Sequence, residues 1–266
     1  IYNIDNLSLF KIDENQGLKN YKFKKLDILN KDEISKILID FKPQRLINFA
    51  AETHVDVSIK NPDAFVKTNI FGTCNLLQSV VNYKNSKNYD QNFIFHQIST
   101  DEVFGSLKVK SKNKLFDEKS IYKPNSPYSA SKAAADHLVR AWSKTYEINY
   151  NITYCSNNYG PFQHPSKFIP VIVISNILKN KIPIYGDGKQ LRDWIYVQDH
   201  VNALIEIINA NFKNETFAIG TSKENVNINV AKNICNHFNK FNKTEYDHKS
   251  LIEFVEDRKG HDIRYG

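Results

Sequence analysis

Residues 92–102, Asn92-Phe-Ile-Phe-His-Gln-Ile-Ser-Thr-Asp-Glu102, decide the fold class of this chain. The mostly apolar run 92–98 predicts a buried strand of a parallel sheet, because such strands are covered on both faces. Two adjacent carboxylates, Asp101 and Glu102, follow the end of that strand. In an open α/β sheet, chemistry takes place just beyond the carboxyl ends of the strands. The stretch therefore predicts an α/β fold with a candidate catalytic site at residues 100–102.

A second motif, Tyr128-Ser-Ala-Ser-Lys132, opens a predicted helix over residues 130–143. Residues four apart share a helix face, and a lysine ammonium near a phenol lowers the pKa of the phenol from about 10. Such a phenol can take a proton from a sugar hydroxyl as hydride leaves the same carbon. A solvated helix turn is the alternative interpretation. The catalytic interpretation is favoured by the preceding Pro124-Asn-Ser-Pro127 and by the upstream strand, which ends in Ser-Thr.

Apolar runs that alternate with helical periodicity predict a Rossmann-like, doubly wound parallel sheet with right-handed crossovers. We expect strands at residues 1–4, 46–50, 92–98 and 151–155, and helices at residues 62–83 and 130–143. The pattern changes after Gly160-Pro161, where a smaller lobe is expected to begin. There we expect a helix at 169–178, a β-hairpin formed by 182–185 and 192–197 with a glycine turn, and a helix at 199–209.

Composition limits the possible functions. The chain of 266 residues carries a net charge of +7, but its lysines are scattered and no basic helix stripe accompanies them. Nucleic-acid binding is therefore not expected. The three cysteines are far apart, fit no metal-ligand spacing and suggest reduced thiols in a cytoplasmic protein. No metal site is expected, and no apolar stretch approaches the ~20 residues of a membrane span.

Four motifs carry a resemblance to a known family. They are Ser99-Thr-Asp-Glu-Val-Phe-Gly105, Pro127-Tyr-Ser-Ala-Ser-Lys132, Cys155-Ser-Asn-Asn-Tyr-Gly-Pro161 and Arg192-Asp-Trp-Ile-Tyr-Val197. The chain resembles the dTDP-glucose 4,6-dehydratases, which are extended short-chain dehydrogenase/reductases, from residue 1 to residue 266. This resemblance implies an NAD-binding domain at 1–161 and an interleaved nucleotide-sugar-binding part at 162–266. It implies catalysis by Thr100, Asp101, Glu102, Tyr128 and Lys132.

Compared with the family that it resembles, the sequence is expected to lack segments at both ends. No Gly-x-Gly-x-x-Gly or Gly-x-x-Gly-x-x-Gly occurs, and residues 1–4 resemble a second strand of a Rossmann fold. We expect that a first strand, its glycine-rich turn and a first helix are missing from the sequence. The absent strand would be the shared neighbour of the strands that end at Asp5 and near Phe49. The end at Gly266 is also abrupt for the family.

Cofactor contacts are implied at the ends of several strands. An acidic residue after the second strand, here Asp5, binds the adenosine ribose and selects NAD; an ordinary turn aspartate is the alternative. Small residues after the next strand would let NAD approach the backbone, although tight packing would also explain Ala50 and Ala51. The full implied set for NAD is Asp5, Asn6, Asp27, Ile28, Phe49, Ala50, Ala51, Thr68, Tyr128, Lys132 and Asn158.

For the nucleotide sugar, Arg192 has an argument independent of the resemblance, because a guanidinium binds diphosphate oxygens in a bidentate manner. A surface ion pair with Asp193 or Asp187 is the alternative. The implied substrate set is Thr53, Thr100, Asn157, Lys167, Phe168, Pro183, Ile184, Tyr185, Arg192, Asn227, Asp257, Arg258 and His261.

The expected activity is the NAD-dependent dehydration of a nucleotide-diphosphate hexose, with dTDP-glucose favoured over UDP-glucose. A nucleotide-sugar epimerase or decarboxylase on the same scaffold remains open, and it would not need Asp101. The alternative outside the enzymes is a catalytically silent protein that binds a dinucleotide. The helices at 62–83 and 130–146 resemble those that pair family subunits, so a homodimer is expected.

Overall fold

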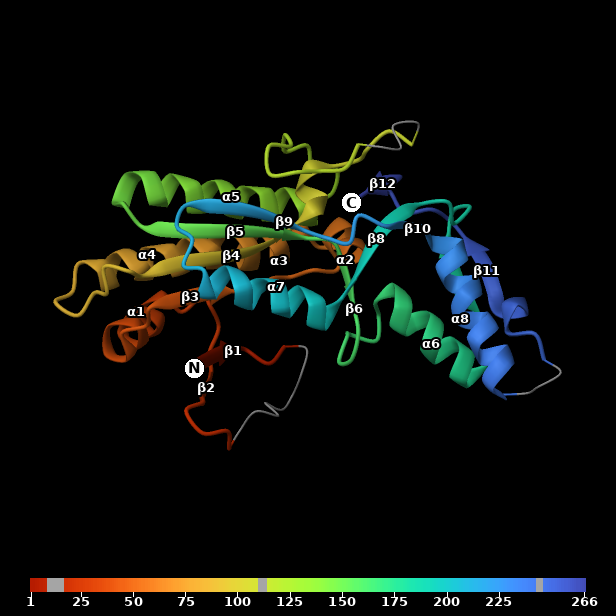
Figure 1. Cartoon of the computed structure of the whole chain (residues 1–266), viewed down its shortest axis with the longest axis horizontal. Coiled ribbons are helices and arrows are strands. Elements are labelled where there is room, and N and C mark those ends of the chain that lie inside the picture. Colours follow the sequence, from red (N-terminus) through yellow and green to blue (C-terminus); the bar gives the residue numbers. More distant parts are fainter. Residues whose placement is uncertain (9–16, 110–113, 243–245) are drawn as a thin grey trace. The chain divides into compact units, whose positions relative to one another are not determined.

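The computed structural model describes residues 1–8, 17–109, 114–242 and 246–266. The chain forms two compact units, each built from several segments (Figure 1). Unit 1 comprises residues 1–99, 126–153 and 212–217, and unit 2 comprises residues 100–125, 154–211 and 218–266. The chain first passes from unit 1 to unit 2 between Ser99 and Thr100, immediately before the carboxylate pair.

Unit 1 has the parallel α/β architecture that the sequence predicts. Its strands are β1 (Tyr2–Asp5), β2 (Lys22–Lys25), β3 (Arg45–Asn48), β4 (Ile94–Thr100), β5 (Asn149–Cys155) and β9 (Glu215–Ile219). β1 and β2 pair in parallel, and a second sheet has the order β3-β4-β5-β9, with β3 parallel to β4. Within the described ranges β1 and β3 belong to separate sheets and do not pair. On the β3 edge, Ile47 is 36% and Phe49 60% exposed.

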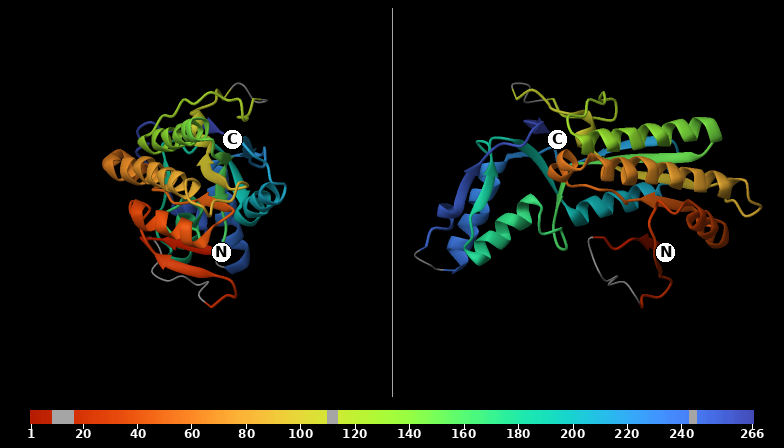
Figure 2. Two further views of the ribbon diagram at one scale, coloured as in Figure 1. Left: turned by 90° about the vertical axis from the view of Figure 1, so that its left-hand side faces the viewer. Right: turned by 180° about the vertical axis from the view of Figure 1, so that it is seen from behind.

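The helices of unit 1 are α1 (Lys31–Phe41), α2 (Val55–Lys60), α3 (Pro62–Phe65), the π-helix η1 (Val66–Gly72), α4 (Thr73–Lys84) and α5 (Pro127–Tyr146). α1, α4 and α5 lie side by side on one face of the four-stranded sheet (Figures 1 and 2). The helix expected over 62–83 is present as the contiguous α3, η1 and α4, but its segment Val66–Gly72 is π-helical. The wider π-turn presents the buried side chain of Asn69 toward α5.

Helix α5 begins earlier than predicted. Pro127 takes the first position, where its missing N–H costs no hydrogen bond, and Ser126 and Ser129 form a capping box. The helix ends at Tyr146, because Glu147 adopts a left-handed conformation with φ 52°. These caps place Tyr128 in the first turn of the helix.

Unit 2 contains η2 (Asp101–Phe104), β6 (Asn157–Tyr159), α6 (Phe168–Leu178), β7 (Ile182–Tyr185), β8 (Leu191–Tyr196), α7 (Val197–Asn209), β10 (Glu224–Val226), α8 (Asn227–Asn242), η3 (His248–Leu251), β11 (Ile252–Val255) and β12 (Arg264–Tyr265). The predicted β7–β8 hairpin is wrong: β7 pairs in parallel with β11, whereas β8 pairs with β6, β10 and β12. Gly186 and Gly188 do form the turn, with φ of 57° and 69°. The strands separate because Ile182 and Ile184 are buried in a core shared with α6, α8 and η3.

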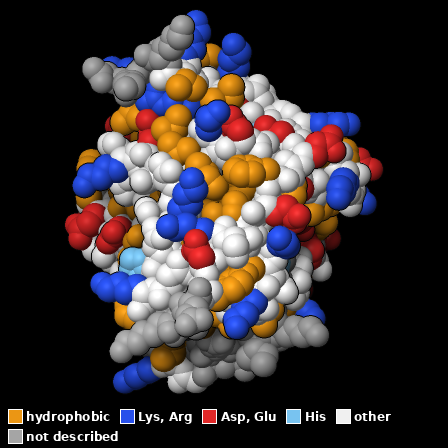
Figure 3. All heavy atoms as spheres, turned by 90° about the vertical axis from the view of Figure 1, so that its right-hand side faces the viewer, with side chains coloured by type: hydrophobic (Ala, Val, Ile, Leu, Met, Phe, Trp, Pro, Cys, Tyr) orange, Lys and Arg blue, Asp and Glu red, His pale blue; other side chains and the backbone are white. Residues whose placement is uncertain are grey.

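Two further observations concern the surface and the helices of the described residues. On the face shown in Figure 3, basic and acidic side chains are interspersed around hydrophobic ones, with no continuous basic stripe. None of the helices in the described ranges is both long and apolar enough to cross a bilayer.

Candidate active site

The carboxylate pair lies at the start of unit 2, on a short 3-10 turn. β4 is buried along its whole length, and Thr100 at its end caps η2 by accepting a hydrogen bond from the Glu102 N–H at 3.3 Å. The turn closes at Gly105, whose φ is 78°, and a Cβ there would lie 2.1 Å from the Lys123 carbonyl oxygen. The backbone therefore approaches closely at a point where only glycine fits. The turn that carries Asp101 and Glu102 therefore ends at a position that requires glycine.

Burial sets the protonation of this pair. Asp101 is only 6% exposed, and burial followed by the charge of Glu102 raises its pKa well above the ordinary value, against the opposing effect of Arg192. Burial also raises the pKa of Glu102, but Arg258 and Arg192 oppose that rise. Asp101 is therefore the better candidate for a neutral acid and Glu102 for an ionised base. Two neighbouring carboxyl groups whose environments separate their pKa values are typical of acid/base pairs in active sites.

Arg192 is a charged group of unit 2 that lowers the pKa of both Asp101 and Glu102. Its side chain is buried, at 4% exposure, and its NH groups donate to the carbonyl oxygens of Leu191 and Asp262, both at 2.7 Å. Its guanidinium carbon lies 3.9 Å from the ring centroid of Tyr265. The alternative of a surface ion pair is wrong, because these contacts bury the guanidinium and Asp187 pairs with Lys189 instead.

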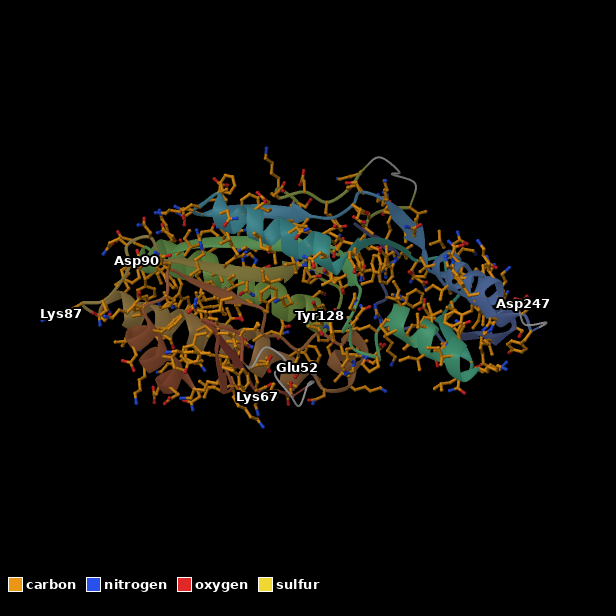
Figure 4. The ribbon with its side chains drawn as sticks, turned by 60° about the horizontal axis from the view of Figure 1, so that its bottom comes forward. Glu52, Lys67, Lys87, Asp90, Tyr128 and Asp247 are labelled. Atoms are coloured by element: carbon orange, nitrogen blue, oxygen red, sulfur yellow. The ribbon has the colours of Figure 1, made fainter. Side chains whose placement is uncertain are left out.

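Tyr128, labelled in Figure 4, and Lys132 both lie near the start of α5, in unit 1. Tyr128 is 8% exposed and makes an edge contact with Phe65. Lys132 is 4% exposed, and its Nζ donates to the Ile98 carbonyl oxygen at 2.7 Å. Ile98 belongs to β4, two residues before Thr100. The lysine is therefore anchored to the strand that leads into the carboxylate pair.

The residues proposed for NAD are mostly found at strand ends of unit 1. Asp5 ends β1, and the Asn6 side chain donates to Asp27 Oδ2 at 3.1 Å. Residues 49–51 follow β3, where Ala50 and Ala51 are half-buried and the Ala50 N–H donates to Asn48 Oδ1 at 3.2 Å. The remaining members are the buried Ile28, the half-buried Thr68 on η1, and Asn158 of unit 2. Asn158 Oδ1 lies 2.9 Å from His200 Nδ1.

The residues proposed for the nucleotide sugar lie in unit 2, apart from Thr53, which is an exposed residue of unit 1. Lys167 precedes α6, and Phe168 stacks on Trp194 with ring centroids 5.7 Å apart. Pro183, Ile184 and Tyr185 lie on β7, where Ile184 belongs to the core and only its neighbours are exposed. His261 Nδ1 lies 2.6 Å from Asp257 Oδ1, and its ring meets Tyr185 edge-on.

Three members of this set carry buried polar atoms that lack a hydrogen-bond partner in the described part of the chain. These atoms are Asn157 Oδ1, Asn227 Oδ1 and Arg258 Nε. Buried polar atoms are normally satisfied, and exceptions often mark binding sites. The donor and acceptor chemistry of the three fits a sugar nucleotide, which offers hydroxyl, carbonyl and phosphate groups.

Sequence reasoning missed the residues that hold this machinery in place. Asn69 of η1 accepts from the Glu52 N–H at 2.8 Å and donates to the Glu52 carbonyl oxygen and to Ser131 Oγ. Ser99 donates to Asp136 at 2.6 Å, where both side chains are buried. The available signal was a set of polar residues within otherwise apolar, buried segments. These contacts join the loop after β3, the end of β4 and the catalytic turn of α5.

A parallel sheet with Tyr128 and Lys132 on a capped helix, and with a buried carboxylate pair after β4, defines a nucleotide-sugar-modifying short-chain dehydrogenase/reductase. The family model described as GDP-mannose 4,6 dehydratase matches residues 1–265, and the chain belongs to this family.

Among characterised relatives, the dTDP-glucose 4,6-dehydratase of Escherichia coli is 42% identical over 281 residues, covering 100% of this chain and 78% of the relative. The structure of the Streptomyces venezuelae dTDP-glucose 4,6-dehydratase with NAD bound has a TM-score of 0.87 and 32% identity, and the match covers 100% of this chain and 77% of that one. The Bacillus anthracis dTDP-glucose 4,6-dehydratase, also solved with NAD, has a TM-score of 0.81 and 36% identity, with coverages of 100% and 78%.

Proposed function

We propose that this protein dehydrates a nucleotide-diphosphate hexose, with dTDP-glucose as substrate and dTDP-4-keto-6-deoxyglucose and water as products. The observation that carries the proposal is the Asp101–Glu102 pair, which is held on a capped turn and has its pKa values raised by burial. A 4-epimerase needs the Tyr–Lys motif, but it needs no buried acid such as Asp101 next to a carboxylate base such as Glu102. The relatives at about 40% identity are named as dTDP-glucose 4,6-dehydratases, which favours thymidine over uridine.

The residues present fit NAD. Carboxylates of Asp5 and Asp27 at the ends of adjacent parallel strands suit ribose hydroxyls, and the small side chains of Ala50 and Ala51 after β3 leave room for a cofactor. When bound, NAD⁺ accepts hydride from the sugar and later returns it. Asp5, Asn6, Asp27, residues 49–51, Thr68 and Asn158 would hold the cofactor.

The chain's own residues supply the proton transfers. Tyr128, assisted by the Lys132 ammonium and Thr100, takes the proton of the C4 hydroxyl as hydride leaves C4. The resulting C4 ketone acidifies the C5 hydrogen, which Glu102 removes as a proton. Asp101, kept neutral by its burial, protonates the departing C6 hydroxyl to give water. Arg258 and Arg192 oppose the pKa rise of Glu102 and so favour its ionised form, whereas burial and the charge of Glu102 favour the protonated form of Asp101.

We also propose that NAD binds the part at 1–161, that the sugar nucleotide binds the part at 162–266, and that the protein is a cytoplasmic homodimer. The exposed Val66 and Phe71 on η1 and Tyr146 on α5, at 40%, 58% and 38% exposure, support a contact between copies. The location is supported by three free cysteines, since cytoplasmic thiols remain reduced.

The test is incubation of the purified protein with NAD⁺ and each of dTDP-glucose and UDP-glucose, followed by product analysis. Formation of a 4-keto-6-deoxy sugar from dTDP-glucose supports the proposal. A C4-epimerised hexose or a pentose would identify an epimerase or a decarboxylase. The absence of any turnover, with NAD⁺ still bound, would identify a silent dinucleotide-binding protein.

A further inference from the structure

The proposed dehydration leaves Tyr128 with one proton too many and Asp101 with one too few, and the following inference rests on that proposed function. Hydride moves from C4 to C6, and Glu102 removes the C5 proton and returns it to C5. The C6–O bond breaks with its electron pair on oxygen, and the Asp101 proton completes the water. Tyr128 keeps the proton of the C4 hydroxyl. After one turnover Tyr128 therefore holds one additional proton and Asp101 lacks one, so Asp101 needs a source of protons.

Unit 2 contains a pocket of about 110 Å³ that reaches Asp101. Asp101, Ser156 and Asp193 line it and are 6%, 6% and 2% exposed. The segment 218–222 also lines the pocket through Ala218, Gly220 and Ser222, which are exposed. The pocket thus has a buried end at the acid and an accessible rim.

Two buried oxygen atoms at the inner end lack a hydrogen-bond partner among the residues that the structure describes. They are Asp101 Oδ2 and Ser156 Oγ. The other oxygen of Asp101 lies 3.5 Å from Thr100 Oγ1, at the limit of a hydrogen bond. A space of this size with several polar groups can hold more than one water molecule, and each water makes about three hydrogen bonds.

The rim is fixed independently of Ser156 Oγ. The Asp193 carboxylate accepts from the Thr221 and Ser222 N–H groups at 2.8 and 3.0 Å, and the Ser156 N–H donates to the Ile219 carbonyl oxygen at 3.0 Å. A Cβ built on Gly220 would lie 2.5 Å from Asp193 Oδ2 and 3.5 Å from Ser156 Oγ. The absence of a side chain at Gly220 therefore keeps the space beside these groups open.

We propose that this pocket is a proton-relay site in which Ser156 and water molecules carry protons from solvent to Asp101 between turnovers. A serine hydroxyl suits this role because it donates and accepts a hydrogen bond at the same time. Asp193 holds the rim through its hydrogen bonds to residues 221 and 222 and does not shuttle the proton. The raised pKa of Asp101 supports the inference, because an acid with a high pKa takes a proton readily at neutral pH.

The experiment compares the first turnover with later ones. Ser156→Ala removes the relay hydroxyl, and Ser175→Ala is the matched control, because Ser175 is 7% exposed, lies outside the pocket and donates to the Lys181 carbonyl oxygen. Rapid mixing of the NAD⁺-loaded protein with dTDP-glucose gives the rate of product formation in the first and in subsequent cycles. Ala218→Leu, at the exposed rim, narrows the pocket without removing a buried group. It therefore tests the relay even if Ser156→Ala does not fold.

If the relay supplies protons to Asp101, variants that block it should show a burst, which is a fast first turnover followed by slow later ones. In Ser156→Ala and Ala218→Leu the first turnover should occur within about twofold of the unaltered rate, since Asp101 starts protonated, and later turnovers should be at least ~10-fold slower. Ser156→Thr should restore steady turnover, and the control should show no burst. Equal slowing of first and later cycles, or no slowing of either, would overturn the relay while leaving the dehydratase function intact. Failure of the unaltered protein to form product would overturn both.

Discussion

Replacement of Asp101 by asparagine tests the central assignment most directly. The change is nearly isosteric and keeps an oxygen that can accept from Thr100, but it removes the proton that the proposed elimination requires. A positioned general acid contributes ~10² to 10⁴ in rate, which is about 3 to 5 kcal/mol of activation free energy. Asp101 is 6% exposed and burial raises its pKa well above the ordinary value, which favours the protonated form that an acid requires. We therefore expect a loss in the upper half of that range.

The assay separates oxidation from elimination. C4 oxidation needs Tyr128 and leaves the cofactor reduced, whereas elimination needs Asp101 before hydride can return to C6. In Asp101→Asn the absorbance of NADH should rise after mixing with dTDP-glucose and decay slowly. Asp187→Asn is the control, because Asp187 is exposed and forms an ion pair with the exposed Lys189. Turnover of Asp101→Asn at the unaltered rate, or a loss with no NADH signal, would refute the acid role.

Further predictions concern the remaining parts of the site and its stability. Tyr128→Phe should prevent any NADH signal, because the variant cannot take the C4 hydroxyl proton; a normal signal would contradict its role. Asn69→Ala should lower the rate of C4 oxidation about 10-fold or more, since it frees both Glu52 and Ser131; single-turnover absorbance measures it. The raised pKa of Asp101 means that its contribution to stability is present below its unfolded pKa and is lost as pH rises through its folded pKa. Asp101→Asn should therefore increase the free energy of unfolding at neutral pH but not near pH 3, as measured by urea titration. Ile184→Ala, in the unit 2 core, should cost about 2–5 kcal/mol in the same titration.

The sequence by itself determined the fold class and the principal chemistry. Periodic apolar runs predicted β4, β5, α6 and α7 within a few residues, because strand and helix periods depend on local spacing alone. The adjacent Asp101 and Glu102, and the spacing of Tyr128 and Lys132, are likewise local features. Their proposed roles followed from the carboxyl-end rule for parallel sheets and from a resemblance carried by short motifs.

Only the tertiary structure decided which strands pair and how the site is supported. β7 and β8 are adjacent in sequence with a glycine turn between them, yet burial of Ile182 and Ile184 against α6 and α8 gives β7 a distant partner in β11. The π-helix that presents Asn69 has the same apolar pattern as an ordinary helix, so periodicity could not reveal it.

Arg192 illustrates the same limit for the site. Its residue type suggested a diphosphate ligand or a surface ion pair. The ion pair is wrong, because the guanidinium donates to the carbonyl oxygens of Leu191 and of Asp262, 70 residues later, and the ring of Tyr265 lies against its face. Its role as a diphosphate ligand stays a prediction. The pKa values of Asp101 and Glu102 likewise depend on burial and on these arginine charges. Such quantities arise from segments far apart in sequence, and local spacing carries no information about them.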